Sequence, residues 1–242
     1  MLIKTRGIIF RSLKYSETSV IVDIYTEEKG LRAYIVNGVR SKNARIKASV
    51  LQVMTLVDMV AYDRNDNKLA RIREIKVAYV YQSIPFDVVK GAVGLFMIEL
   101  ARKTIQESEK NEGLFNFLFG SFQELDATEH PVSNLHIGFM IELTAFLGFQ
   151  PGGNYDMEES RVFDLLEGVF APPEAEGHQS LDEGQSILLD NFLKTPMKQA
   201  YKIKLNRKER KDFLNQLLLF YRLHVESFDT LNAHKILEEV LG

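Results

Sequence analysis

The feature that most constrains the fold is a change of hydrophobic period close to Pro85. Before it, five short segments rich in β-branched and aromatic residues partly alternate between apolar and polar positions, which is typical of strands. After it, apolar residues recur at i, i+3, i+4 and i+7, as in Val89, Ala92, Val93 and Phe96, which is typical of helices. The sequence therefore predicts an α+β protein with a β domain over residues 1–82 and an all-helical domain over residues 83–242.

The β domain is expected to close on itself. Turn-forming stretches separate the five predicted strands, which are GIIFRSLKY, SVIVDIY, LRAYIV, LQVMTLVDMVAYD and ARIREIKVAYVY. Closure into a small barrel removes exposed strand edges, and five strands favour the oligonucleotide-binding (OB) barrel. An SH3-like barrel or an open sheet fits the pattern nearly as well.

The helical domain is interrupted at about residues 150–183. This stretch contains Pro, Gly and nine acidic residues, and its apolar islands RVFDLL and GVFAP indicate two short strands or an excursion packed on the helices. Helical patterns resume at EGQSILLDNFLKT and again after Asn206, which forms a capping-box pattern with Glu209. A last helix is predicted in TLNAHKILEEVLG.

The net charge of -3 hides an asymmetry between the two halves. Residues 1–82 contain 15 Lys and Arg against 8 Asp and Glu, a net charge of +7, whereas residues 83–242 contain 15 against 25, a net charge of -10. A basic front half predicts a polyanionic partner. Lysines that only keep exposed strands soluble are the alternative.

Basic residues gather on the stretch NGVRSKNARIK, residues 37–47, which contains four cations and no acid. Lys4, Arg6, Arg11, Lys14, Arg71 and Arg73 on the first and fifth predicted strands add to it. Such cations neutralise phosphates and release counterions, which gives affinity for any nucleic-acid sequence. We therefore predict nucleic-acid binding by the cations of this stretch, Arg40, Lys42, Arg45 and Lys47. A solvated loop without a ligand is the alternative.

A second basic cluster surrounds the start of the helix after Asn206. Cations are unfavourable there, because the N-terminal end of a helix dipole is already positive. An anionic partner, either phosphate or an acidic peptide, explains them better than helix energetics, although a surface run without a role stays open. The cluster consists of Lys198, Lys202, Lys204, Arg207, Lys208, Arg210 and Lys211.

Catalytic patterns are missing from the sequence. It has no glycine-rich phosphate loop, no HExxH motif and no GxSxG motif, and the absence of cysteine excludes disulfides and thiolate zinc sites. It also lacks a signal peptide and any apolar run of about 20 residues that could span a bilayer. These observations predict a cytoplasmic protein without enzymatic activity or cofactor.

Several segments together resemble the bacterial recombination-mediator RecO family. YSETSVIVDIYTEEKG followed by NGVRSK is similar to the family's N-terminal signature. LFMIELARK resembles its first long helix, ELTAFLGFQP resembles the helix end before its variable region, and LLLFYRLHVESFDTLNAHKILEEVL is similar to its closing segment. The likeness follows nearly the whole chain in order.

This resemblance implies an OB domain and a helical domain that together mediate DNA repair and recombination without breaking bonds. The family binds single- and double-stranded DNA, anneals complementary strands, and works with RecR to load RecA onto strands covered by single-stranded-DNA-binding protein (SSB). Nucleoid association follows from such a role. Arg40 and Lys42 fall inside the matched loop and take the DNA-contact role, which proximity extends to Arg6, Arg11, Arg45, Lys47, Arg71 and Arg73.

Two further expectations come from the resemblance. Many members hold a structural zinc through four cysteines in the region of residues 150–183. This chain has none, so we predict no zinc and a segment held by packing of Val162, Phe163, Leu165 and Phe170. The family contacts the acidic, apolar C-terminal tail of SSB. A binding site for that tail needs an apolar hollow and a cation for the terminal carboxylate. Arg102 and Lys103 are the first candidates, followed by Lys202, Lys204, Lys208 and Lys211.

Three rival functions remain open at the level of sequence. An RNA-binding OB protein would use the same basic surface, and a protein-interaction scaffold would leave it inert. An unrecognised nuclease would assemble its site from distant residues.

Overall fold

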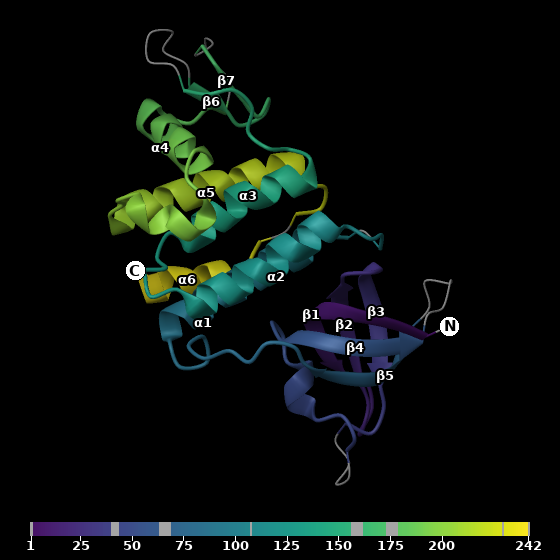
Figure 1. Cartoon of the computed structure of the whole chain (residues 1–242). Helices are drawn as coiled ribbons and strands as arrows, with labels where there is room; N and C mark the ends of the chain where they lie inside the picture. Colours follow the sequence, from purple (N-terminus) through teal and green to yellow (C-terminus); the bar gives the residue numbers. More distant parts are fainter. Residues whose placement is uncertain are drawn as a thin grey trace. The chain divides into compact units, whose positions relative to one another are not determined.

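The computed structural model describes residues 2–39, 44–62, 69–106, 108–155, 162–172, 179–228 and 230–241. The chain forms two compact units. The first, called the barrel unit, comprises residues 1–86 and 105–127, and the second, called the helical unit, comprises residues 87–104 and 128–242. Figure 1 shows the elements of each unit along the chain.

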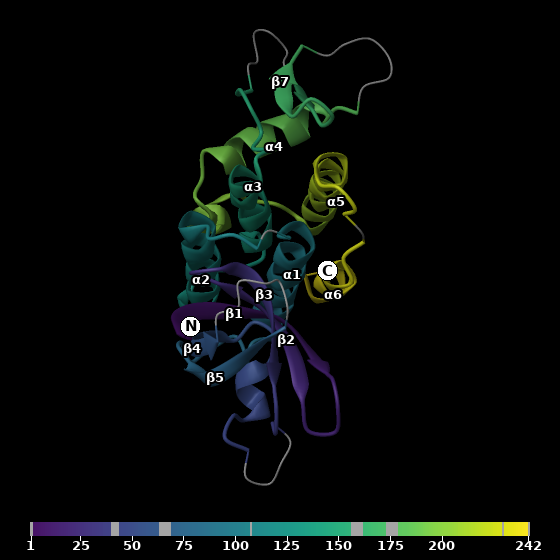
Figure 2. The ribbon, with the colours of Figure 1, turned by 90° about the vertical axis from the view of Figure 1, so that its right-hand side faces the viewer.

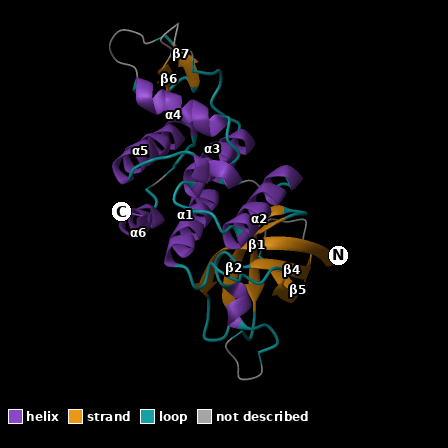
Figure 3. Cartoon of the chain, turned by 60° about the vertical axis from the view of Figure 1, so that its left-hand side comes forward, coloured by secondary structure: helices purple, strands orange, loops and turns teal. Residues whose placement is uncertain are grey.

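Five strands of the barrel unit form a closed barrel in the order β1-β2-β3-β5-β4, with β4 paired back onto β1. All neighbours are antiparallel except β3 and β5, which run parallel. This arrangement, drawn in orange in Figure 3, confirms the predicted five-stranded OB barrel. The strands are β1 (Leu2–Lys14), β2 (Val20–Thr26), β3 (Gly30–Val36), β4 (Leu56–Tyr62) and β5 (Ala70–Val77).

The long first strand is what allows the barrel to close. Its first half pairs with β4 and its second half with β2, and the register shifts between Ile9 and Arg11. Gly7 lies where the two halves meet, and a Cβ there would come within 2.6 Å of Ile24 Cγ2, so a side chain would clash with the core. The short 3₁₀ helix η1 (Ala48–Leu51) contributes the buried Leu51 to that core.

Helix α2 (Glu112–Ala127) belongs to the barrel unit. Its Phe115 stacks on Tyr25 of β2 with ring centroids 6.2 Å apart. The predicted domain boundary at residue 82 concerns the linear chain and stays a prediction. The compact units follow contacts instead, and they group α2 with strands that end 35 residues or more before it begins.

Asp126, near the end of α2, fixes the segment that leaves the barrel. Its carboxylate accepts hydrogen bonds from the backbone N–H groups of Gln82, Ser83 and Ile84 and from the Tyr79 hydroxyl, at 2.8–3.1 Å. Burial would raise the pKa of Asp126, but these hydrogen bonds to the charged form outweigh it, and the pKa is lowered. One buried carboxylate thus holds the backbone of three consecutive residues, 82–84, and the side chain of Tyr79.

The helical unit is built around the apolar helix α3 (Leu135–Leu147), nine of whose residues are buried. Tyr221 of α5 (Arg207–His224) is fully buried and donates its hydroxyl proton to the carbonyl oxygen of Met140 at 2.7 Å. Helices α1 and α6 lie side by side (Figure 2), and the Glu99 carboxylate of α1 accepts the backbone N–H of Asn232 and Ala233 at the start of α6. The remaining elements are α1 (Val88–Thr104), α4 (Glu183–Leu193), η2 (Met197–Lys202), α5 (Arg207–His224) and α6 (Ala233–Leu241).

Two sequence predictions for this unit are confirmed. Asn206 and Glu209 form a capping box at the start of α5. The irregular segment contains the hairpin of β6 (Val162–Asp164) and β7 (Val169–Ala171), in which Phe163 packs edge-to-face against Phe170 and against Phe220 of α5.

Packing therefore holds the described part of this segment, as predicted. Phe163, Leu165 and Phe170 are buried, whereas Val162 is only partly buried. The Leu165 carbonyl oxygen also lies 2.8 Å from His224 Nε2. His178 lies outside the described residues, and the absence of zinc stays a prediction.

Over the described ranges, no helix is long and apolar enough to cross a membrane.

Candidate nucleic-acid interface

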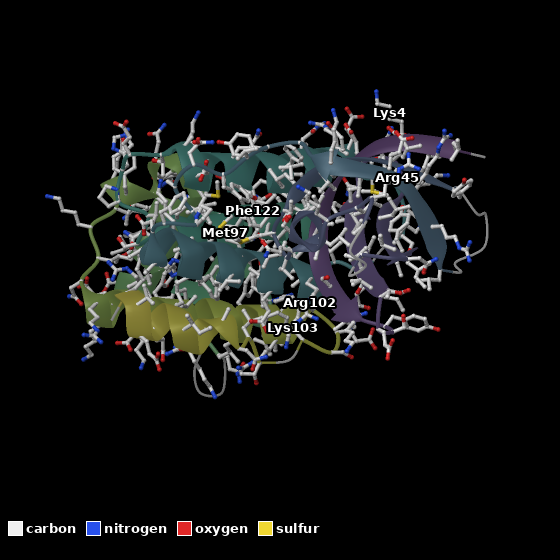
Figure 4. All side chains as sticks on the ribbon, turned by 90° about the horizontal axis from the view of Figure 1, so that it is seen from below. Lys4, Arg45, Met97, Arg102, Lys103 and Phe122 are labelled. Atoms are coloured by element: carbon white, nitrogen blue, oxygen red, sulfur yellow. The ribbon has the colours of Figure 1, made fainter. Side chains whose placement is uncertain are left out.

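The predicted DNA-binding residues differ in how the structure engages them. Arg40 and Lys42 lie outside the described residues. Arg45 and Lys47 are exposed on the segment that leads into η1, and Arg45 and Lys4 lie on the outer surface of the barrel (Figure 4).

Arg6 is committed to contacts within the barrel unit. Its guanidinium donates to both carboxylate oxygens of Glu27 at 2.9 and 2.6 Å and lies 5.1 and 5.0 Å from the ring centroids of Phe115 and Phe119. The hydrogen bond between the two charges raises the pKa of Arg6 and lowers that of Glu27. Arg6 therefore ties β1 to the turn after β2 and to α2, and a phosphate would have to compete with Glu27 for it.

Arg11 is engaged in a similar way on the other half of β1. Its Nε donates to Asp23 Oδ2 at 2.5 Å, and the two residues are directly paired across β1 and β2. Opposite charges in such a pair support the sheet. DNA contact by Arg6 and Arg11 stays a prediction, and their geometry gives each a structural role first.

One cation of β5, Arg73, and one of the segment before η1, Arg45, converge on a single acid. Arg45 lies 3.7 Å and Arg73 lies 3.4 Å from the carboxylate of Glu74, and all three side chains are about half exposed or more. Val60 separates Glu74 from Lys4, because it pairs with both residues on neighbouring strands. Three cations therefore surround one carboxylate, which leaves this face positive.

Four cations of the barrel have no acidic partner within the described part of the chain, and all four are exposed. Because these cations are exposed and form no ion pair there, an external anion can bind them without breaking an existing contact. Even exposed ion pairs contribute little stability. They come from β1, the segment before η1 and β5, namely Lys4, Lys14, Lys47 and Arg71. Sequence reasoning named all four but could not separate them from the paired arginines.

The helical unit holds a second candidate site, the α5–α6 cavity, whose cations belong to the second basic cluster of the sequence but whose hollow the sequence did not predict. It has a volume of about 100 Å³. Its walls combine apolar side chains with three cations and one acid, and they consist of His136, Arg207, Arg210, Lys211, Leu214, Leu237, Glu238 and Leu241.

His136 gives this cavity an unusual wall. The imidazole is completely buried, and neither ring nitrogen has a hydrogen-bond partner among the residues that the structure describes. Burial lowers the pKa of His136 to about 3, with help from the charges of Arg210 and His234. A neutral imidazole keeps one N–H donor, so His136 can donate to a ligand in the cavity.

The cations of the cavity are held differently. Arg210 donates to the side-chain oxygen of Asn134 at 2.8 Å and to the Leu205 carbonyl oxygen at 3.0 Å, and burial lowers its pKa. Lys211 lies 3.3 Å from the carboxylate of Glu238 on α6. The cavity is therefore apolar, lined by excess positive charge, and already in contact with one carboxylate.

The other predicted partner-binding residues lie elsewhere in the helical unit. Arg102 and Lys103 are adjacent at the end of α1 (Figure 4), where Lys103 Nζ donates to the Thr230 carbonyl oxygen at 2.6 Å. Lys204 lines a more polar hollow beside α4. Lys202 and Lys208 are exposed, and only Lys211 of the predicted set reaches the cavity.

Comparisons with known proteins agree along the whole chain. Residues 1–81 match the family model "Recombination protein O N terminal", and residues 85–231 match "Recombination protein O C terminal". Similar proteins include the DNA repair protein RecO of Christiangramia forsetii, at 39% identity over 100% of both chains. Those of Flavobacterium psychrophilum, at 32% over 100% of both chains, and Bacteroides fragilis, at 33% over 99% of both chains, are also similar.

Proposed function

The chain belongs to the RecO family of DNA repair proteins, and on that premise we propose that it is a recombination mediator. It binds single- and double-stranded DNA through the barrel, anneals complementary strands and helps load a recombinase onto SSB-coated strands. The observation that carries this proposal is the set of exposed barrel cations without an acidic partner among the described residues, Lys4, Lys14, Lys47 and Arg71.

Annealing follows from the same charges. Two DNA strands repel each other, and a shared cationic surface screens that repulsion and raises their local concentration. No bond is made or broken in such a step, so the mediator needs no catalytic residue and no cofactor. Because the contacts are to phosphates, the affinity depends weakly on sequence and steeply on salt.

The helical unit recruits protein partners in this proposal. The SSB tail is acidic and apolar, and the α5–α6 cavity offers an apolar hollow beside Arg207, Arg210 and Lys211. The terminal carboxylate of the SSB tail would replace Glu238 as the ionic partner of Lys211 and accept a hydrogen bond from the N–H of His136. RecR is the second partner that membership implies, and the place of action is the nucleoid.

A strand-annealing assay with complementary oligonucleotides coated with SSB tests the mediator function. We expect the protein to speed annealing of the coated strands, and a double variant K47A/R71A to slow it. The matched control K194A/K235A removes two exposed lysines of the helical unit and should anneal like the wild type. Equal annealing with and without the wild-type protein would refute the proposal.

RNA binding is the rival that shares the barrel surface. The described cations recognise phosphates, which both nucleic acids carry, whereas discrimination for RNA requires a contact to the 2′-hydroxyl. Competition between DNA and RNA oligonucleotides of the same sequence decides between them, and a clear preference for RNA would favour the rival.

A further inference from the structure

The outside of the barrel carries a row of apolar side chains that crosses the strands. Leu13 pairs with Ile21, Ile21 pairs with Ile35, and Ile35 pairs with Arg71. Directly paired residues project to the same face of a sheet. That face is the outer one, because the residues next to Ile21 and Ile35 along each strand belong to the barrel core, namely Val20, Val22, Tyr34 and Val36.

The row continues from β5 onto β4 and back to β1. Ala61 and Ile72 are paired and both lie in the core, so the next residues toward the β4–β5 connection, Tyr62 and Arg71, face outward. Tyr62 in turn pairs with Leu2. We call this row the outer belt, and it consists of Leu2, Leu13, Ile21, Ile35 and Tyr62 with Arg71 among them.

The outer belt is accessible despite its apolar character. Leu2, Leu13 and Tyr62 are 40%, 46% and 48% exposed, and Ile21 and Ile35 are partly buried. Of the nine tyrosines, seven are engaged by a ring contact, hydrogen bond or other contact in the described structure. Tyr62, and Tyr15 just after the end of β1, are the two tyrosines whose side chains have no such contact among the described residues.

The charges around the belt indicate its occupant. Arg71 interrupts the apolar row, and Arg73 lies two residues after it on β5. Lys4 lies two residues after Leu2 on the same face of β1, whereas Lys14, which pairs with the core residue Val20, is exposed beside Leu13 at the end of β1. An apolar row that contains one cation and has others close to its ends matches a chain that exposes a flat apolar group and one negative charge at every step. Single-stranded nucleic acid is such a chain, whereas a duplex hides its bases by stacking them inside.

Resting on the DNA binding proposed above, we propose that unpaired bases pack against the outer belt while Arg71 and the flanking lysines hold the phosphates. Successive strands lie about 4.8 Å apart, so the four steps from β1 through β2, β3 and β5 to β4 span about 19 Å of surface. A few nucleotides reach from Leu13 to Tyr62. The barrel therefore prefers single strands to duplex DNA through contacts that are independent of salt.

The first test removes the exposed apolar groups. Fluorescence anisotropy compares the full-length wild type and the variant L13S/Y62S on a labelled 20-nucleotide oligo(dT) and on a duplex of equal length. We expect at least fivefold weaker binding of oligo(dT), less than a twofold change for the duplex, and an unchanged salt slope, because no phosphate contact is lost. The control V80S alters an apolar residue of the barrel unit that is 66% exposed and outside the belt, and it should bind like the wild type.

The second test uses a conservative variant that keeps the aromatic ring. The chain contains no tryptophan, so Y62W carries a single indole in the belt. We expect oligo(dT) to quench its fluorescence, because bases stack on the ring. The control F86W places the only indole at a position that is 85% exposed and outside the belt, where quenching should be absent.

The outcomes separate this inference from the proposed function. Salt-dependent binding of oligo(dT) by the wild type, with unchanged affinity of L13S/Y62S and no quenching of Y62W, overturns the belt and leaves DNA binding in place. A wild type that binds neither DNA overturns the proposed function itself. If L13S/Y62S loses affinity for oligo(dT) and for the duplex equally, the inference is also overturned. The same holds if L13S/Y62S stops self-associating in sedimentation but still binds oligo(dT) like the wild type, because the belt is then a contact between protein chains.

Discussion

The barrel unit and the helical unit both gather cations, but they present them to different kinds of anion. On the barrel, Lys47 and Arg71 lie on an open outer surface. In the helical unit, Arg210 and Lys211 line a cavity of about 100 Å³ whose other walls are apolar. An open row of cations suits a long polyanion of any sequence, whereas cations around a small hollow suit one carboxylate attached to an apolar side chain.

One buried ionisable group in each unit, Asp126 and His136, shows a second difference. Asp126 of the barrel unit is buried and accepts several hydrogen bonds, whereas His136 of the helical unit is buried and has none. Burial favours the neutral form of both groups, and only Asp126 is compensated. The barrel unit therefore uses its buried charge for structure, and the helical unit leaves a buried polar group facing a cavity.

The largest effect is expected from D126N, which tests the structural side of this comparison. The amide is uncharged, so the backbone N–H groups of residues 82–84 lose an ionic acceptor, and we expect a loss of about 2–3 kcal/mol in the free energy of unfolding at pH 7. Urea unfolding measures it.

The pH dependence of that loss is the control. The folded pKa of Asp126 is lowered, so its contribution is present above the unfolded value near 4 and is lost as the pH falls through the folded pKa. The difference between wild type and D126N should shrink below about pH 4. A difference that stays equal at pH 7 and pH 3 would show that the charge of Asp126 is not the cause.

His136 should make the helical unit sensitive to milder acid. Its pKa is about 3 when folded and near 6.5 when unfolded, so the unfolded state binds more protons in between, and stability falls as the pH drops below about 6.5. Between pH 6.5 and 5 we expect a loss of roughly 2 kcal/mol. The variant H136L should abolish this loss in urea unfolding, and an unchanged pH profile would contradict the assignment to His136.

The α5–α6 cavity should distinguish a free terminal carboxylate from a blocked one. We expect K211A to weaken binding of an acidic peptide with an apolar C-terminal residue about fivefold, because a partly exposed ionic contact contributes about 1 kcal/mol. Isothermal titration calorimetry measures the affinity, and the same peptide with an amidated C-terminus is the control. Equal affinity for both peptides would show that the cavity does not bind the terminal carboxylate.

The smallest effect is expected from E238Q. Glu238 lies 3.3 Å from Lys211 and therefore competes with an incoming carboxylate for that lysine. Its neutral amide should raise the affinity of the same peptide about two- to threefold, since exposed ion pairs are weak. Weaker binding by E238Q would mean that Glu238 contacts the peptide itself.

Sequence periodicity was sufficient to predict the elements, because strands and helices leave their period in the pattern of apolar residues. The five strands, the capping box of Asn206 and Glu209, and the packing of Phe163 and Phe170 follow from local chemistry. The grouping of α2 with the barrel does not, because it depends on contacts such as Arg6 with Phe115, more than 100 residues apart.

The candidate sites were predictable only in part for the same reason. Residue types identified the cations, but the pairing of Arg11 with Asp23 depends on strand register. The cations Arg207, Arg210 and Lys211 are visible in the sequence, whereas the cavity that they line requires Leu237 and Glu238 of another helix. His136 lies within an apolar helical pattern in the sequence, but that its buried ring lacks hydrogen-bond partners among the described residues appears only in three dimensions.

The most direct test of the central claim is the salt dependence of DNA affinity for the wild type and K47A/R71A. The logarithm of the affinity for a random single-stranded oligonucleotide should fall steeply and linearly with the logarithm of the salt concentration. Each phosphate contact contributes about 0.7 to that slope, so the variant should be shallower by about 1.4. Wild-type affinity that barely changes with salt, or an identical slope in the variant, would contradict a barrel that binds DNA through its open cations.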